Sequence, residues 1–125
     1  MKSKMHNRPR VHVVDDEHLI ANTLAKILNM NGYAASAFYD AETALEVAKT
    51  NCPDIFICDV MLVGMNGVDA AIRIKELCPT TRVILFSGQA EASDLLTNAQ
   101  RCGHSFEILA KPLRPEALLR RLKLN

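Results

Sequence analysis

Apolar and polar residues follow two periods that alternate along the chain. Five short apolar runs are each followed by a stretch with apolar residues at helical spacing, such as Ile20, Leu24 and Ile27. The runs predict strands at residues 10–14, 33–39, 54–58, 82–86 and 106–110. The stretches predict helices at residues 17–30, 41–49, 68–77, 91–101 and 115–124, with Asn31–Gly32 ending the first and Asp40 capping the second.

Five successive strand–helix units predict an α/β domain with a parallel sheet. Five units are too few for a closed barrel, and right-handed crossovers favour a doubly wound, five-stranded (βα)5 sheet of the flavodoxin-like order 2-1-3-4-5. We expect residues 1–9 to form an N-terminal tail and residues 10–125 to form one domain. In such sheets the ligand site lies at the carboxyl ends of the central strands.

The composition is that of a soluble globular protein. Apolar residues make up 49% and charged residues 23% of the 125 residues, and the net charge is +1. Because the chain carries no strong net charge, we expect no direct binding to nucleic acid or membranes. No apolar run approaches the ~20 residues of a membrane helix, so we expect a cytoplasmic protein.

Four cysteines occur at spacings that do not suggest a metal site. Cys52, Cys58, Cys78 and Cys102 contain no CxxC pair, and no histidine stands at zinc-finger spacing from them. We therefore expect reduced thiols in the core or on the surface.

Polar side chains follow four of the predicted strands: Asp15 and Asp16 the first, Asp59 the third, Ser87 the fourth and Lys111 the fifth. The fold brings these positions to one edge of the sheet. Three carboxylates in one crevice repel each other unless a cation neutralises them. Mg²⁺ fits a site with few carboxylates and open positions, which leaves room for phosphate oxygens.

Several short motifs occur at successive strand ends: VHVVDDE at residues 11–17, Asp59 with Gly67 downstream, Ser87–Gly88 and Lys111–Pro112. Each motif alone is weak, but their order and placement are specific. Together they resemble the receiver domains of bacterial response regulators over nearly the whole chain.

The resemblance implies a Mg²⁺ site and a phosphoacceptor. It implies that Asp16 is a direct metal ligand, that Asp15 binds through water, and that Asp59 and the backbone carbonyl of Met61 complete the set. Asp59 would accept a phosphoryl group from the phosphohistidine of a sensor histidine kinase or a phosphotransfer protein. The domain would then be no classical enzyme, although it would assist its own phosphorylation and dephosphorylation.

The resemblance also implies how the phosphoryl group is held and read. Lys111 would pair with Asp59 before the reaction and with phosphoryl oxygens after it, and a cis Lys111–Pro112 bond would aim the lysine inward. Ser87 would bond a phosphoryl oxygen, which would bias the segment that follows it. A downstream protein target, and a homodimer that forms on phosphorylation, would respond to this change.

The chain departs from the family pattern at two places. After Asp59 it has Leu62–Val63–Gly64 in place of a proline-containing loop, so we expect a slightly looser loop with intact chemistry. Ile108 stands where the family places an aromatic switch residue, and Phe106 on the same strand face is the candidate substitute.

The sequence is compatible with three alternatives. The chain is either a complete single-domain receiver or a fragment of a longer DNA-binding regulator. A degenerate receiver would act only as a protein-interaction module. An unrelated alternative is a flavodoxin-like enzyme or cofactor carrier, but the acidic residues after the first strand would repel a flavin phosphate.

Overall fold

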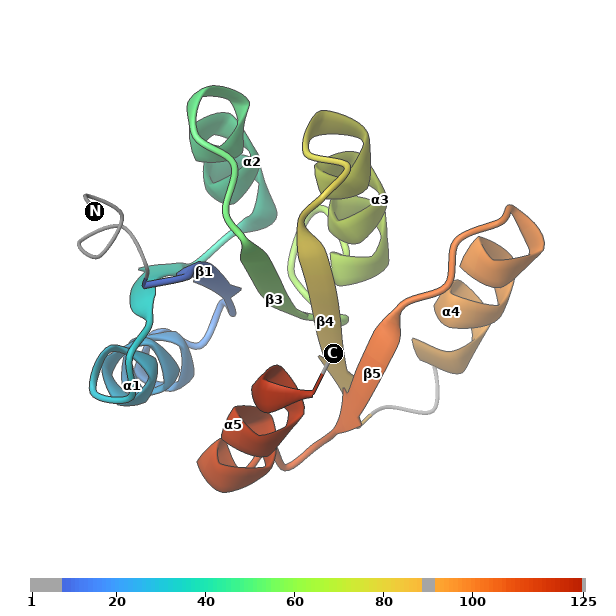
Figure 1. The fold of residues 1–125 in the computed structure, drawn as a ribbon. Helices are drawn as coiled ribbons and strands as arrows, with labels where there is room; N and C mark the ends of the chain where they lie inside the picture. The colour runs from blue at the N-terminus through green and yellow to red at the C-terminus, as the bar shows by residue number, and fades with distance from the viewer. Residues whose placement is uncertain (1–7, 89–91, 125) are drawn as a thin grey trace.

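The computed structural model describes residues 8–88 and 92–124, in which five strands alternate with five helices (Figure 1). The strands are β1 (Arg10–Val14), β2 (Ala34–Phe38), β3 (Ile55–Asp59), β4 (Arg82–Ser87) and β5 (Glu107–Ala110). The helices are α1 (His18–Asn29), α2 (Ala41–Thr50), α3 (Gly67–Leu77), α4 (Ala92–Arg101) and α5 (Pro115–Lys123). Neighbouring strands pair in parallel in the order β2-β1-β3-β4-β5, which confirms the predicted fold class.

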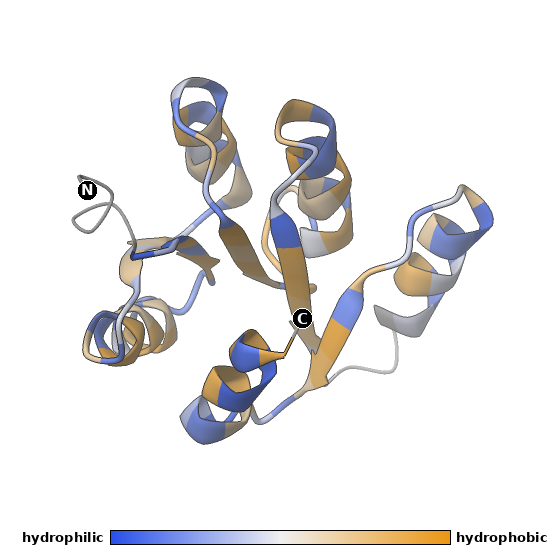
Figure 2. Cartoon of the chain, viewed as in Figure 1, coloured by the Kyte–Doolittle hydropathy of each residue, from blue (hydrophilic) through white to orange (hydrophobic). Residues whose placement is uncertain are grey.

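Helices cover both faces of the sheet. The helices α1 and α5 lie on one face, and α2, α3 and α4 lie on the other (Figure 1). Leu24 and Leu118 pack in the core of the first face, and Phe56 and Ile74 in that of the second. Figure 2 shows the strands as the hydrophobic centre, with hydrophilic positions on the outer parts of the helices. Cover on both faces explains why β3 is buried at every position and reads as an unbroken apolar run.

The predicted helix signals are confirmed. The Asp40 side chain caps α2 by accepting a hydrogen bond from the Thr43 N–H at 2.6 Å, and Gly32 follows α1 with φ 95°. Predicted and observed bounds in the described residues differ by one residue at most: α1 begins at His18 and β5 begins at Glu107. The predicted start of the fourth helix at residue 91, and residues 1–7 of the predicted tail, lie outside the described residues.

The prediction that all four cysteines are reduced thiols was wrong for two of them. Cys52 and Cys78 form a disulfide, whereas Cys58 is a buried free thiol and Cys102 an exposed one. The helices α2 and α3 lie side by side on the sheet, and each of the paired cysteines stands at or just after the end of one of them. The pairing therefore comes from the packing of two helices, which the spacing of cysteines does not reveal.

Buried His12 is expected to make the fold sensitive to acid. Its side chain on β1 is 4% exposed, packs against the Phe38 ring at 4.8 Å, and leaves Nδ1 without a hydrogen-bond partner among the described residues. Burial, and next the charge of Arg10, lower the pKa of His12 from 6.5 to about 4. Between these values the unfolded chain binds a proton that the folded chain does not, so the free energy of unfolding falls as the pH falls from 6.5 towards 4.

Between pH 7 and pH 4.5, we expect the free energy of unfolding to fall by about 2 to 3 kcal/mol more in the wild type than in His12→Leu. Urea unfolding of both proteins at the two pH values measures this difference. Other titrating groups act equally in both proteins, so equal losses would show that His12 does not carry the effect.

Candidate functional site

The register of the central strands brings two carboxylates together. Val14 of β1 pairs with Cys58 of β3, so the next residues along each strand, Asp15 and Asp59, lie side by side at the carboxyl edge of the sheet. Asp16 follows directly, and each of the three carboxylates has an oxygen within 4.8 Å of the others. The structure thus brings together the three acidic residues that the sequence singled out.

Backbone N–H groups hold each carboxylate in place. Asp15 is fully buried, and its Oδ1 accepts a hydrogen bond from the N–H of Glu17 at 2.9 Å. Asp59 is 4% exposed, and its Oδ1 accepts from the N–H of Met61 at 3.1 Å. Asp16 is less buried, and its Oδ2 accepts from the N–H of Val63 at 3.3 Å. The loop after β3 therefore donates hydrogen bonds to two of the three carboxylates, those of Asp59 and Asp16.

Lys111 reaches into this cluster from the end of β5. Its Nζ donates to Asp59 Oδ2 at 2.7 Å and lies 5.6 Å from the centre of the Phe86 ring. The peptide bond between Lys111 and Pro112 is cis, as the resemblance implied. A Cβ on Gly88 would lie 2.8 Å from the Cβ of Lys111, so the absence of a side chain there leaves room for the lysine stem.

Gly67 permits an even closer approach, to the backbone of Asp59. A Cβ at this position would overlap the backbone carbonyl oxygen of Asp59 and lie 2.8 Å from the Cα of Val60. The N–H of Gly67 donates to the carbonyl of Val60 at 2.8 Å, which starts α3 against the end of β3. The glycine thus fixes where the loop returns to the sheet.

The cluster has more negative charge than the lysine can neutralise. Burial is the largest cause that raises the pKa of Asp15 from 3.8 to about 6. The charges of Asp59 and Asp16 act in the same direction, and the Glu17 N–H and the charge of Lys111 oppose them. Asp15 Oδ2 is buried and has no hydrogen-bond partner among the described residues. A hard divalent cation supplies what this oxygen lacks, so the donor set fits Mg²⁺.

The two other predicted site residues lie at the same edge. Ser87 ends β4, is partly buried, and lines a hollow with Gly88 and Lys111; its carbonyl accepts from the Lys111 N–H at 3.1 Å. The Met61 N–H faces Asp59, while the role of its carbonyl as a metal ligand stays a prediction.

The two departures from the family pattern lie in the loop after β3 and at Ile108 in β5. Gly64 takes φ 87° in the loop after β3, and Val63 beside it is 81% exposed. Ile108 and Phe106 both pack against the core on the α2–α4 side of the sheet, which confirms that they share a face. The substitution of Phe106 for a switch aromatic stays a prediction.

The sequence did not reveal a groove beside Lys111. It has a volume of about 480 Å³ and lies between α1 and the segment after β5, with Glu17, Ile20, Phe86 and Leu113 in its lining. Its residues come from three separate segments and have no motif of their own, so no signal in the sequence joins them.

None of the helices in the described ranges combines the length and the apolar character needed to cross a membrane.

Comparison with known proteins identifies a family. The response regulator receiver domain family matches residues 11–123. The chain is 37% identical over 87 residues to the autoinducer 1 sensor kinase/phosphatase LuxN of Vibrio campbellii, which covers 70% of this chain and 10% of that protein. It is 26% identical over 116 residues to the DNA-binding response regulator MtrA of Mycobacterium tuberculosis, which covers 93% of this chain and half of that protein.

Solved structures agree with this match. A CheY-like receiver domain protein from Methanospirillum hungatei has a TM-score of 0.81 at 24% sequence identity. The match covers 94% of this chain and 92% of that one, and it shows that the two share a fold. The BeF3-activated receiver domain of DrrB, a protein of Thermotoga maritima, has a TM-score of 0.77 at 28% identity, covering 93% and 95%. The chain therefore belongs to the response regulator receiver domains of two-component signal transduction.

Proposed function

We propose that Asp59 accepts a phosphoryl group from the phosphohistidine of a sensor histidine kinase or a phosphotransfer protein. One observation carries this proposal: the Asp59 carboxylate is buried beside two other carboxylates, with one oxygen on Lys111 Nζ and the other on the Met61 N–H. These contacts fix the direction in which the carboxylate faces an incoming phosphorus atom.

The chemistry is a covalent phosphoryl transfer. A carboxylate oxygen of Asp59 attacks phosphorus, and the bond between phosphorus and the donor nitrogen breaks, which leaves a mixed anhydride on Asp59 and a neutral imidazole on the donor once a proton is taken up. Lys111 then follows the negative charge from the carboxylate to the phosphoryl oxygens. The domain is thus a phosphoacceptor that assists its own phosphorylation and dephosphorylation.

Asp15, Asp16 and Asp59, with the carbonyl of Met61, are the groups that would hold Mg²⁺. The buried and unpartnered Oδ2 of Asp15 supports this assignment. Bound Mg²⁺ would neutralise charge on the carboxylates and on the phosphoryl oxygens. Asp16 is the most accessible of the three carboxylates.

Ser87 is proposed to report the phosphorylated state. Its hydroxyl would bond a phosphoryl oxygen on Asp59, and because that bond exists only after transfer it would favour a second arrangement of the segment after β4. A downstream protein, or a second copy of the chain, would bind the changed surface. A cytoplasmic location is part of this proposal.

A second candidate is that the domain works as one part of a longer regulator. The chain spans half of MtrA and a tenth of LuxN. The length of the native reading frame tests this candidate, because a single-domain receiver requires a frame that ends close to residue 125.

The test of phosphate acceptance is direct. Incubation with Mg²⁺ and acetyl phosphate is expected to add the mass of one phosphoryl group to the intact protein, and no mass to Asp59→Asn, because the amide cannot form the anhydride. Chelation of Mg²⁺ is expected to prevent the addition in the wild type. If neither acetyl phosphate nor a cognate kinase added mass to the wild type, the domain would be a binding module and the proposal would fail.

A further inference from the structure

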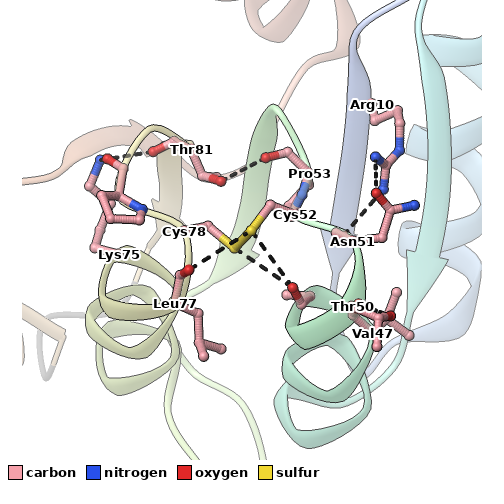
Figure 3. The surroundings of a disulfide bond; sticks show 12 residues. Arg10, Val47, Thr50, Asn51, Cys52, Pro53, Lys75, Leu77, Cys78 and Thr81 are labelled. Atoms are coloured by element: carbon pink, nitrogen blue, oxygen red, sulfur yellow. Dashed lines mark hydrogen bonds between the residues drawn. A yellow bond between two sulfur atoms is a disulfide. The ribbon is translucent and has the colours of Figure 1, made fainter.

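A covalent link joins the segments that lead into β3 and β4, on the face of the sheet that α2, α3 and α4 cover. Cys52 lies in the segment between α2 and β3, Cys78 is the C-cap of α3, and Figure 3 shows their sulfur atoms bonded across the gap between the two helices. Their Cα atoms are 5.8 Å apart, and 26 positions separate them in the sequence. This pair stands at the amino ends of β3 and β4, whereas Asp59 stands at the carboxyl end of β3.

The same two segments are also joined without the sulfur atoms. The buried hydroxyl of Thr81 donates to the carbonyl of Pro53 at 2.6 Å, and the N–H of Arg82 donates to the carbonyl of Asp54 at 3.0 Å (Figure 3 shows the first of these). These bonds join the two segments independently of the sulfur atoms. We therefore expect the fold to persist without the disulfide, with the reduced cysteines facing each other at high effective concentration.

Carbonyl groups at the ends of both helices surround the sulfur atoms. The carbonyl oxygen of Ala48 lies 3.7 Å from Sγ of Cys52 and 3.8 Å from Sγ of Cys78, and that of Leu77 lies 3.9 Å from Sγ of Cys52. Reduced thiols can donate hydrogen bonds to these oxygens, so opening the disulfide leaves neither thiol without an acceptor. The negative ends of the helix dipoles disfavour thiolates here, which opposes a catalytic role in disulfide exchange.

The two sulfur atoms differ in access. Cys52 is an exposed residue and Cys78 is 2% exposed. An external thiol or disulfide therefore reacts at Cys52, and Cys78 acts as the internal partner. The two other cysteines take no part: Cys58 is buried on β3, and Cys102 lies at the far end of α4.

We propose that Cys52 and Cys78 form a reversible thiol–disulfide pair, which a low-molecular-weight disulfide closes and a low-molecular-weight thiol opens. In the closing direction the Cys52 thiolate attacks one sulfur of the small disulfide, which forms a mixed disulfide and releases one small thiol. The Cys78 thiolate then attacks Sγ of Cys52 and expels the second small thiol. Two electrons pass from the protein dithiol to the small disulfide, and two protons go with them to the released thiols.

The pair acts on stability and leaves the phosphoacceptor unaffected. The strand β3 has five residues, of which Asp59 is the last, so its length of roughly 13 Å separates the linked segment from Asp59. The disulfide constrains the unfolded chain by closing the loop that contains β3 and α3, which raises the melting temperature of the oxidised form. It changes none of the contacts that hold Asp15, Asp59 or Lys111.

The test uses the full chain with Cys102→Ser, which removes the exposed thiol that could pair between molecules. The reduced protein is equilibrated in buffers of oxidised and reduced glutathione, quenched in acid, alkylated with N-ethylmaleimide in denaturant and weighed. As the buffer becomes more oxidising, we expect three adducts (Cys52, Cys58, Cys78) to give way to one (Cys58) in a two-electron transition. Peptide mapping is expected to join Cys52 to Cys78, and added Cys52→Ser is expected to abolish the transition.

Two further measurements separate stability from chemistry. The oxidised form is expected to melt on the order of 10 °C above the reduced form, and the two forms are expected to take phosphate from acetyl phosphate at rates within about twofold of each other. Three results of the mass analysis would overturn the inference: a mass that stays at three adducts, a stable glutathione adduct on Cys52, or a disulfide that includes Cys58. Equal melting temperatures of the two forms, or phosphorylation rates tenfold apart, would also overturn it. If neither form takes phosphate, the proposed function fails while the thiol–disulfide pair stands on its own result.

Discussion

Replacing Lys111 by methionine is expected to slow phosphorylation of Asp59 by acetyl phosphate about 100-fold, because removal of a preorganised charged donor typically costs this much. Lys111 Nζ contacts Asp59 Oδ2 at 2.7 Å. In the proposed reaction this ammonium group meets negative charge as it moves onto the phosphoryl oxygens. Methionine keeps the length of the side chain and its packing over Phe86 while it removes the charge.

Lys123→Met is the matched control. Lys123 is exposed at the last position of α5, so this variant loses the same charge away from the cluster. We expect it to react at the wild-type rate, and the rate is measured as the gain of phosphoryl mass with time. Equal rates in Lys111→Met and Lys123→Met would remove Lys111 from the mechanism.

Replacing Gly67 by alanine is expected to lower the free energy of unfolding by about 3 kcal/mol or more. The new methyl group would overlap the backbone carbonyl of Asp59, which cannot rotate away as a side chain could. The end of β3 must therefore shift, and we expect phosphorylation to weaken together with stability. Denaturant unfolding gives the first quantity, and the acetyl phosphate assay gives the second.

Gly103→Ala serves as the comparison for this change. Gly103 has φ 92° with open space around its Cα, so alanine there meets only the backbone cost of the left-handed region, about 1 to 2 kcal/mol. We expect this variant to phosphorylate normally. If it cost as much stability as Gly67→Ala, close packing below Asp59 would not explain the need for glycine.

Most of the fold could be predicted because its signals are local. Apolar periodicity located all ten elements to within one residue in the described ranges. Asp40 caps α2 and Gly32 follows the end of α1, as predicted. The acidic cluster could be predicted because parallel strands end at one edge, so residues that follow strands meet there. Asp15, Asp59 and Lys111 satisfied that rule.

The features that could not be predicted depend on packing between distant segments. Cys52 and Cys78 read as free thiols, because their pairing depends on how α2 and α3 lie on the sheet. Burial of His12 depends on the cover that helices give to β1, and its neighbours in the sequence do not show it. The overlap at Gly67 depends on the path by which the loop returns to β3.

Because Val14 pairs with Cys58, the acidic cluster depends on the register of β1 against β3. Insertion or deletion of one residue within β1 would displace Asp15 by about 3.3 Å and turn its side chain to the opposite face of the sheet. A change of the same size in a surface loop between a helix and the next strand would leave the carboxylates where they are. The domain can therefore vary in the lengths of these loops, while the lengths of its central strands are constrained by the geometry of three oxygen atoms.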